Sequence, residues 1–156
     1  MHVVLASPVL RDPAEFARVL LALLEVAIMV NVAQFRATPT FPTLARSGVK
    51  YTREAAFEFV QGAGELVAKR RPYDSVRDAW AVLKDGAGDC AHLVAWDVAD
   101  KHLGRGVPVD TKAKPRIEWR TRTVVKSGRR KSLRVFHVQT RCGDGRIEDP
   151  SARLGM

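Results

Sequence analysis

Helical patterns fill the first two thirds of this 156-residue sequence, and strand patterns follow them. Asp12 and Pro13 are typical of a helix start, and the apolar run after them predicts a buried helix from about Pro13 to Phe35. This helix belongs to an apolar N-terminal helical segment, residues 1–36. Because helices precede strands, we predict an α+β fold with an antiparallel β-sheet, in one domain that spans residues 1–156.

Two more helical segments are predicted before the middle of the chain. The first runs from about Arg53 to Lys69 and is broken by residues 70–72, which include a proline. The second is short and begins at Asp74 or Ser75, whose side chains are typical of helix caps. It leads the chain into a glycine loop.

The apolar N-terminal run raises the question of a membrane helix. Glu25 and Asn31 interrupt the run, and the uninterrupted pieces are shorter than the roughly 20 residues that a span needs. Asp12 and Glu15 precede the run, where a signal peptide would carry basic residues. We therefore expect no membrane span, with membrane targeting and burial against a partner chain as the open alternatives.

A cysteine stands at the predicted start of a helix, directly after the glycine loop at Gly86 and Gly88. Asp89 is predicted to cap this helix, and Cys90 would lie in a first turn that leads to about Leu103. Free backbone N–H groups at a helix start favour a thiolate, whereas an adjacent carboxylate opposes it. The thiol therefore needs a basic neighbour. The glycines are expected to let the chain approach the helix closely and to leave open space above the sulfur.

Two later residues complete a candidate site. The segment around His137 is rich in β-branched and aromatic residues, which predicts a strand, and alternation places the imidazole among apolar neighbours that face the helix beginning at Cys90. Asp149 follows a turn at residues 141–145, and antiparallel pairing would bring it beside His137. Cys90, His137 and Asp149 thus have the order of a thiol nucleophile, its base and the carboxylate that orients the base.

Each of these residues also has an ordinary structural interpretation. A single cysteine before a helix is often a small buried hydrophobe, and a histidine in a strand is often a satisfied polar group. His92 is predicted to be a surface residue on another helix face, and not the base. Two cysteines suit a reducing compartment, although a disulfide between Cys90 and Cys142 stays open. The histidines form no ligand-spaced cluster, so we expect no metal and no cofactor.

Three segments resemble a known group of proteins. Residues 41–51, 88–96 and 144–156 look like small transglutaminase-like proteins encoded by tailed phages, within the papain-like cysteine protease superfamily. The resemblance covers roughly residues 40–156. One departure is that Ala91 and His92 follow the cysteine, where those phage proteins usually carry acidic residues.

The resemblance implies a fold and two alternative functions. The fold is a transglutaminase-like domain in which an antiparallel sheet packs on the cysteine-bearing helix. The first function is a thiol enzyme with a Cys90–His137–Asp149 triad that hydrolyses peptides or amides or transfers acyl groups. The second is a phage virion structural or assembly protein that uses the same fold as a non-catalytic scaffold. The resemblance also implies a protein or peptide substrate, contacts with phage structural proteins, and a location in the host cytoplasm or the virion.

Charge is distributed unevenly along the chain. Lys/Arg and Asp/Glu balance in residues 1–110, so the net charge of +9 comes from residues 111–156. Basic and apolar positions alternate in residues 116–124, which predicts a strand with a basic outer face, and residues 126–131 predict a basic hairpin turn. We expect general contact with a polyanion or an acidic protein surface, and a solvated sheet face is the alternative. The residues concerned are Arg116, Arg120, Arg122, Arg129, Arg130 and Lys131.

Overall fold

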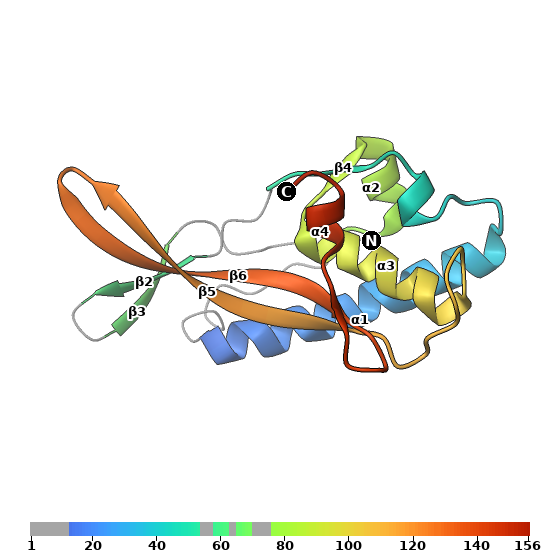
Figure 1. Cartoon of the computed structure of the whole chain (residues 1–156), viewed down its shortest axis with the longest axis horizontal. Coiled ribbons are helices and arrows are strands. Elements are labelled where there is room, and N and C mark those ends of the chain that lie inside the picture. Colours follow the sequence, from blue (N-terminus) through green and yellow to red (C-terminus); the bar gives the residue numbers. More distant parts are fainter. Residues whose placement is uncertain (1–12, 54–57, 63–64, 70–75) are drawn as a thin grey trace.

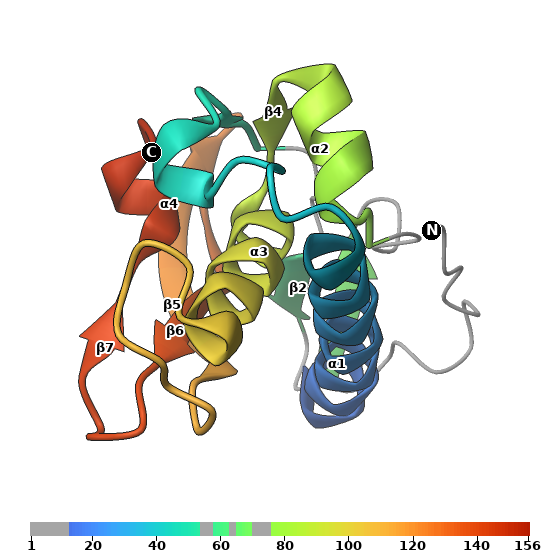
Figure 2. The same ribbon diagram turned by 90° about the vertical axis from the view of Figure 1, so that its right-hand side faces the viewer.

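The computed structural model describes residues 13–53, 58–62, 65–69 and 76–156, and it confirms a mixed α+β architecture with an antiparallel sheet. Two helices, α1 and α3, lie beside the long strand pair β5–β6 (Figures 1 and 2). The elements in chain order are α1 (Pro13–Ala37), η2 (Leu44–Arg46), β1 (Lys50–Tyr51), β2 (Glu58–Gly62), β3 (Glu65–Lys69), α2 (Ala79–Asp85), β4 (Ala87–Gly88), α3 (Cys90–Leu103), β5 (Lys114–Lys126), β6 (Arg129–Arg141), β7 (Ile147–Glu148) and α4 (Pro150–Arg153).

The main sheet has the order β3-β2-β6-β5, and β7 also pairs with β6. Every pairing in it is antiparallel, as the sequence predicts. A separate parallel pair joins β1 to β4, with Tyr51 opposite Gly88. This small pair fixes the segment that leads into α3.

The central element is α3, in which every residue from Cys90 to Lys101 is buried. A helix that is buried on all sides needs neighbours all around it. On one side it shares a core cluster with α1 and Val138 of β6. On another, Leu93 and Trp96 pack in a second cluster with Phe35 and Phe41. The sequence prediction that α3 ends before Gly104 is confirmed, because Gly104 caps the helix with a left-handed φ of 64°.

The prediction of a long N-terminal helix is also confirmed for α1. One face of α1 enters the core, with Phe16, Leu20 and Leu24 fully buried. Residues 14–37 are long and apolar enough to cross a membrane by length and composition, a test that a buried core helix also passes. Asn31 on the buried face accepts a hydrogen bond from the backbone N–H of Ala79 at 2.8 Å, so α1 also positions the start of α2.

The predicted helix over 53–69 is wrong in its described part. Residues 58–62 and 65–69 form the hairpin β2–β3. Strand β2 of this hairpin pairs with β6, with Val60 opposite Leu133. Gly62 and Gly64 stand in the middle of this segment, and glycine weakens a helix interior by about 1 kcal/mol relative to alanine. Strand β6 supplies backbone hydrogen-bond partners for β2, and this distant contact overrides the local helix propensity.

The cap of the short helix α2 also differs from the prediction. Asp78 is the N-cap, and its Oδ1 accepts a hydrogen bond from Ala81 at 3.0 Å. Asp74 and Ser75, the predicted caps, lie outside the described residues. Gly86 ends α2 with a φ of 72°, a left-handed conformation that glycine adopts without strain.

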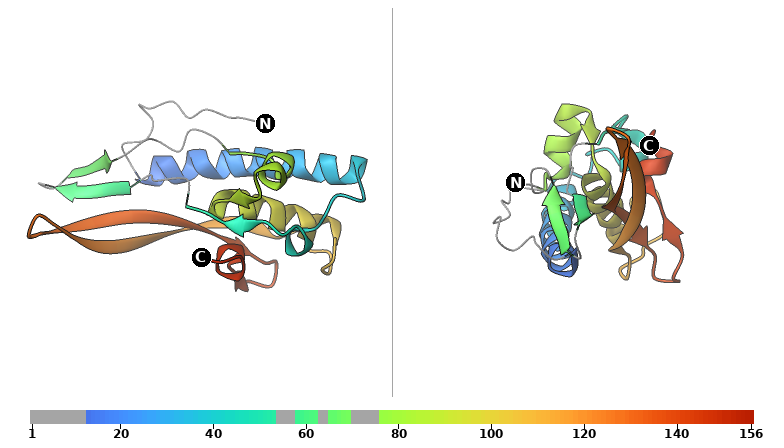
Figure 3. Two further views of the ribbon diagram at one scale, coloured as in Figure 1. Left: turned by 90° about the horizontal axis from the view of Figure 1, so that it is seen from above. Right: turned by 90° about the vertical axis from the view of Figure 1, so that its left-hand side faces the viewer.

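The basic hairpin turn is confirmed as the tip of β5–β6. Ser127 and Gly128 connect the strands with φ values of 55° and 72°, which matches the two-residue turns that suit hairpin twist. Figures 1 and 3 show this tip projecting away from α1 and α3. We call residues 114–141, which comprise both strands and their turn, the basic hairpin.

Candidate functional site

Cys90 is the first residue of α3, as predicted, and Asp89 is its N-cap. The Asp89 carboxylate accepts hydrogen bonds from the backbone N–H groups of Ala91 and His92 at 3.0 and 3.1 Å. The His92 ring faces back toward the backbone N–H of Asp89 at 3.4 Å, which completes a capping box. The prediction that His92 is a surface residue is therefore wrong, since His92 is buried and helps to cap the helix.

The chain approaches Cys90 through a tightly packed glycine. A Cβ at Gly88 would lie 3.0 Å from Cγ1 of Val82 and 3.2 Å from Cβ of His92, so only glycine fits without displacement. The expected close approach of the chain to α3 is confirmed at Gly88, whereas the expected open space above the sulfur of Cys90 is not found. Cys90 itself keeps only 7% of its surface exposed. Cys90 therefore lies at a helix start that is fully capped, and its side chain is almost completely buried.

His137 and Asp149 form the predicted pair. Nε2 of His137 lies 2.7 Å from Oδ2 of Asp149, and the histidine is 5% exposed. The pairing of β6 with β7, Thr140 opposite Glu148, brings Asp149 to this position. A carboxylate at this distance holds the imidazole in one orientation and stabilises its protonated form. Among the described residues, Nδ1 of His137 has no hydrogen-bond partner.

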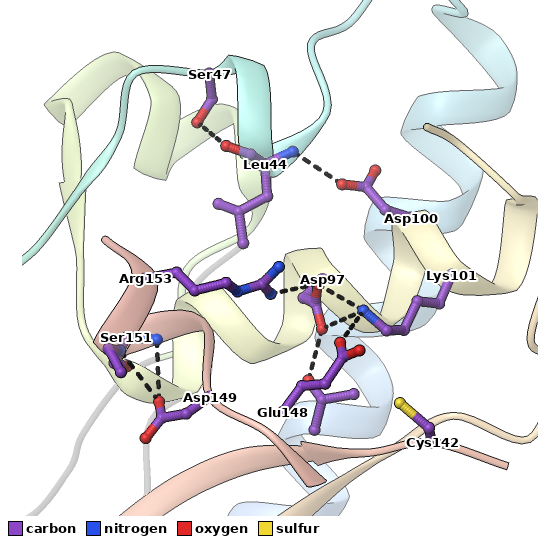
Figure 4. A network of polar contacts seen from close by, with 12 residues as sticks. Leu44, Ser47, Asp97, Asp100, Lys101, Cys142, Glu148, Asp149, Ser151 and Arg153 are labelled. Atoms are coloured by element: carbon purple, nitrogen blue, oxygen red, sulfur yellow. Dashed lines mark hydrogen bonds and ion pairs between the residues drawn. The ribbon is translucent and has the colours of Figure 1, made fainter. Parts of the chain in front are cut away.

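The second oxygen of Asp149 is also fixed. Asp149 is the N-cap of α4, and its Oδ1 accepts hydrogen bonds from the N–H groups of Ser151 and Ala152 at 3.1 and 3.3 Å (Figure 4). The backbone of Tyr51 donates to the carbonyl of Leu154 at 2.9 Å, which ties the end of α4 to β1. One carboxylate thus caps a helix with one oxygen and orients His137 with the other.

The face on which His137 lies differs from the prediction. Helix α3 packs on β6 through Val138, in the shared core, and through Thr140, whose hydroxyl donates to Asp97 at 2.7 Å. Side chains alternate along a strand, so His137 belongs to the opposite row of β6. It shares that row with Glu118 of β5, directly across from it. Asp149, rather than the flank of α3, is its partner.

Cys90 nevertheless lies close to this pair. The backbone N–H groups of Val138 and Ala91 approach the thiol and favour its ionised form, while the charges of Asp89 and Asp149 oppose that form. Val138 follows His137 in the chain, so the thiol meets β6 one residue from the histidine, through a backbone N–H and not through the imidazole. In the described part of the chain, no hydrogen bond joins the Cys90 sulfur to the His137 ring. The thiol therefore lies near the backbone of β6 and the charge of Asp149, and the thiol and the imidazole are held by separate partners.

Burial determines the protonation of the thiol. It raises the pKa of Cys90 to about 12, and the neighbouring charge of Asp89 raises the pKa further, against the lowering effect of the two backbone N–H groups. The sequence suggested two opposing effects on the thiol pKa, a lowering by the helix start and a raising by the adjacent carboxylate. In the structure the raising effect wins, because burial adds to that of the carboxylate. The resting thiol is therefore neutral, and any nucleophilic role requires a base at the moment of attack.

This protonation state gives a first prediction. In a Cys142→Ala background, we expect iodoacetamide to label Cys90 slowly at pH 8 and about tenfold faster for each further pH unit. Asp89→Asn removes a charge that raises the pKa of Cys90 but keeps a good helix cap, so labelling at pH 8 should rise about 3–10-fold. Asp144→Asn, in an exposed turn, is the matched control. Unchanged labelling in Asp89→Asn would contradict this assignment.

Tyr51 is a neighbour of the site that the sequence analysis did not identify. Burial raises its pKa, and the charges of Cys90, Asp89 and Asp149 contribute to the rise. The parallel pairing of β1 with β4 places Tyr51 opposite Gly88. A two-residue parallel pair between distant segments leaves no local signal, which explains why the sequence did not single out this residue.

An ionic network behind the site was not predicted either. Nζ of Lys101 lies 2.9 Å from Asp97 and 2.7 Å from Glu148, and Asp97 also accepts from Arg153 at 3.2 Å and from Thr140 (Figure 4). Burial opposes the charge of Lys101, but the hydrogen bond that Lys101 donates to Glu148 and the charge of Asp97 outweigh it and raise the pKa of Lys101. The network ties β7 and α4 to α3. Helix α3, which begins at Cys90, therefore also positions Glu148, the residue before Asp149.

Both cysteines are free thiols, so the structure contains no Cys90–Cys142 disulfide. Cys142 lies just after β6, where Arg146 approaches its sulfur at 3.9 Å. Burial raises the pKa of this second thiol as well. Two hollows adjoin this end of α3, one of about 230 Å³ beside Asp100 and Arg105 and one of about 720 Å³ beside Cys142. The triad residues line neither of them.

Within the described ranges, no group of three or more His, Cys, Asp or Glu side chains is arranged to hold a metal ion. The chain was also compared with protein-family models, curated proteins and solved structures, and none of them matches it. The transglutaminase-like resemblance thus remains a prediction from the sequence. What the site can do follows from its geometry.

Proposed function

We propose that this chain is a thiol enzyme of papain-like or transglutaminase-like type, in which Cys90, His137 and Asp149 catalyse acyl transfer from an amide or ester to water or an amine. The observation that carries the proposal is the 2.7 Å contact between His137 Nε2 and Asp149 Oδ2, next to a cysteine at a helix start. A half-buried carboxylate that orients an imidazole is the support that a nucleophile's base requires.

The proposed reaction uses the free nitrogen of His137. Nδ1 takes the proton of Cys90 as the sulfur attacks the acyl carbon, and Asp149 stabilises the imidazolium through Nε2–H. The tetrahedral intermediate collapses to a thioester when the leaving group departs with that proton. Water or an amine then attacks the thioester with His137 as base, which frees Cys90. The backbone N–H of Cys90, in the first turn of α3, is a candidate donor to the oxyanion.

A neutral resting thiol is compatible with this mechanism. The pKa of Cys90 near 12 argues against a preformed thiolate–imidazolium pair and for proton transfer during attack, as in serine enzymes. The exposed 7% of Cys90 admits a small acyl group more easily than a folded protein. We therefore expect a small acyl donor to reveal the chemistry first.

The alternative is a non-catalytic scaffold, such as a phage virion structural or assembly protein. The burial of Cys90 and its raised pKa favour this function, because a packed neutral thiol is also an ordinary core residue. The capping interactions of Asp89 and Asp149 stabilise two helix starts whether or not catalysis occurs.

The two functions predict different products with 4-nitrophenyl acetate. The enzyme should release one equivalent of 4-nitrophenolate in a burst, and the tryptic peptide that contains Cys90 should gain one acetyl group. Cys90→Ala should abolish both signals, and Cys142→Ala, the matched loss of a buried thiol, should retain them. Acetylation of Cys142 alone, or of neither cysteine, would favour the scaffold.

A further inference from the structure

The basic hairpin holds the whole charge excess of the protein. Residues 114–141 contain ten basic residues and one acidic residue, so the hairpin's net charge equals the +9 of the entire chain. The single acid, Glu118, forms an ion pair with Arg120 at 2.9 Å. Seven of the ten basic residues are arginines, whose planar guanidinium groups match phosphate oxygens. A surface of this composition attracts a polyanion.

The shape of the basic hairpin narrows the choice of polyanion. The two 13-residue strands are paired along their whole length, from Lys114 opposite Arg141 to Lys126 opposite Arg129. Strand β2 also pairs with β6 from Val135 to Leu133, so among the described strands the end of the hairpin that is only two strands wide runs from Thr123 and Ser132 to the tip, roughly 13 Å at about 3.3 Å per residue. The tip is a two-residue turn that projects away from the helices (Figures 1 and 3). A two-stranded ribbon is narrow enough to enter the major groove of duplex DNA.

Exposure supports contact along the ribbon. Arg116 and Arg120 are exposed on β5, and Arg129 and Arg130 are exposed beside the tip. In the register, Arg116, Arg120 and Arg129 fall in the same row of the two strands. The opposite row is the one that carries Val138 into the core. The row of Arg116, Arg120 and Arg129 therefore presents these three cations to solvent, and it also contains the buried His137. Beside the tip the other row is exposed as well, at Arg130.

The aromatic residues argue against single strands as the preferred partner. Proteins that bind single-stranded nucleic acid stack its bases on exposed aromatic rings. In the basic hairpin, Trp119 and Phe136 instead pack against Phe16 of α1, with ring centroids 5.9 and 5.1 Å away. The hairpin has no other aromatic residue besides His137. Its chemistry is that of phosphate contact without base stacking.

We propose that the basic hairpin is a binding site for duplex DNA, which it contacts through the phosphate backbone without sequence preference. The alternative is that these charges only keep the edge strand β5 from pairing with other chains. The inference is independent of the proposed acyl transfer, because the arginines that carry it are not part of the Cys90 site, although His137 lies on the same hairpin. A Cys90→Ala variant should bind DNA as the unchanged protein does.

Fluorescence anisotropy with a labelled 20-base-pair duplex of mixed sequence tests the proposal. Phosphate contact predicts micromolar binding at 50 mM salt and a slope of log K against log salt of about −4 to −5, for four to six phosphates contacted. Arg129→Glu/Arg130→Glu should raise Kd at least tenfold and reduce the slope by about 2. Arg36→Glu/Arg46→Glu makes the same change in charge away from the basic hairpin and should alter Kd less than threefold. Thermal unfolding checks that both variants are folded.

Three results would overturn the proposal. The first is no binding at 50 mM salt. The second is an equal loss of affinity in both double variants, which would mean diffuse attraction rather than a site. The third is binding of single-stranded DNA, or of a polyglutamate of equal charge, as tight as that of the duplex. The polyglutamate result would indicate an acidic protein partner instead.

Discussion

Asp149→Asn is expected to lower the rate of Cys90 acetylation by 4-nitrophenyl acetate about 100-fold or more, with little loss of stability. In the native protein, Oδ2 of Asp149 accepts from His137 Nε2. An asparagine would present its amide N–H₂ there and would donate, so Nε2 would become the acceptor and Nδ1 would carry the proton. His137 could then not take the proton of Cys90.

The same substitution should keep the fold, because an asparagine oxygen can still accept from Ser151 and Ala152 at the start of α4. The free energy of unfolding, measured by urea denaturation, should therefore fall by less than about 1 kcal/mol. Asp144→Asn is the matched control, because Asp144 lies in the exposed turn before β7. An acetylation rate within threefold of the unchanged protein would remove Asp149 from the mechanism.

Lys101→Met should destabilise the protein by about 3–5 kcal/mol, which makes it the largest effect on stability that we expect. Methionine preserves much of the side-chain volume but leaves Asp97 and Glu148 without their shared cation. The Lys101 and Asp97 side chains are only 7% and 9% exposed, so water does not replace the lost partner. Urea unfolding at pH 7 measures the change.

This effect should depend on pH. The hydrogen bond from Lys101 holds the pKa of Glu148 below its ordinary value in the folded protein. The stabilisation from Glu148 is therefore fully present above its unfolded pKa and is lost as the pH falls through the lowered folded pKa. The difference between Lys101→Met and the unchanged protein should shrink as the pH falls below about 4. Lys112→Met, an exposed lysine near the same end of α3, should change stability by less than about 0.5 kcal/mol at either pH.

Local patterns were sufficient for the helix that begins at Cys90 and for the contact between His137 and Asp149. A capping aspartate before Cys90 and a glycine after Leu103 correctly bounded α3, because caps act within one turn of a helix. The turn before Asp149 correctly predicted its contact with His137, because a short antiparallel pairing follows from chain length alone. The cap of α3 and the contact between His137 and Asp149 were thus predictable because each depends on residues that are close in the chain.

Other features depend on contacts between distant segments. The hairpin β2–β3 forms on the edge of β6, about 75 residues later in the chain, and local propensity favoured a helix there. The Lys101 network joins α3 to β7 and α4, and Tyr51 reaches Gly88 through a two-residue parallel pair. The pKa of Cys90 was likewise not predictable, since it depends mainly on how deeply the thiol is buried.

The measurement that tests the central claim most directly is the rate at which 4-nitrophenyl acetate acetylates Cys90, compared between His137→Ala and the unchanged protein, both in a Cys142→Ala background at pH 7.5. If His137 takes the thiol proton, the rate should fall about 100-fold or more in the variant. His102→Ala, which removes a histidine at the far end of α3, should leave it unchanged. Equal rates with and without His137 would show that Cys90 has no base, and would contradict the thiol-enzyme account.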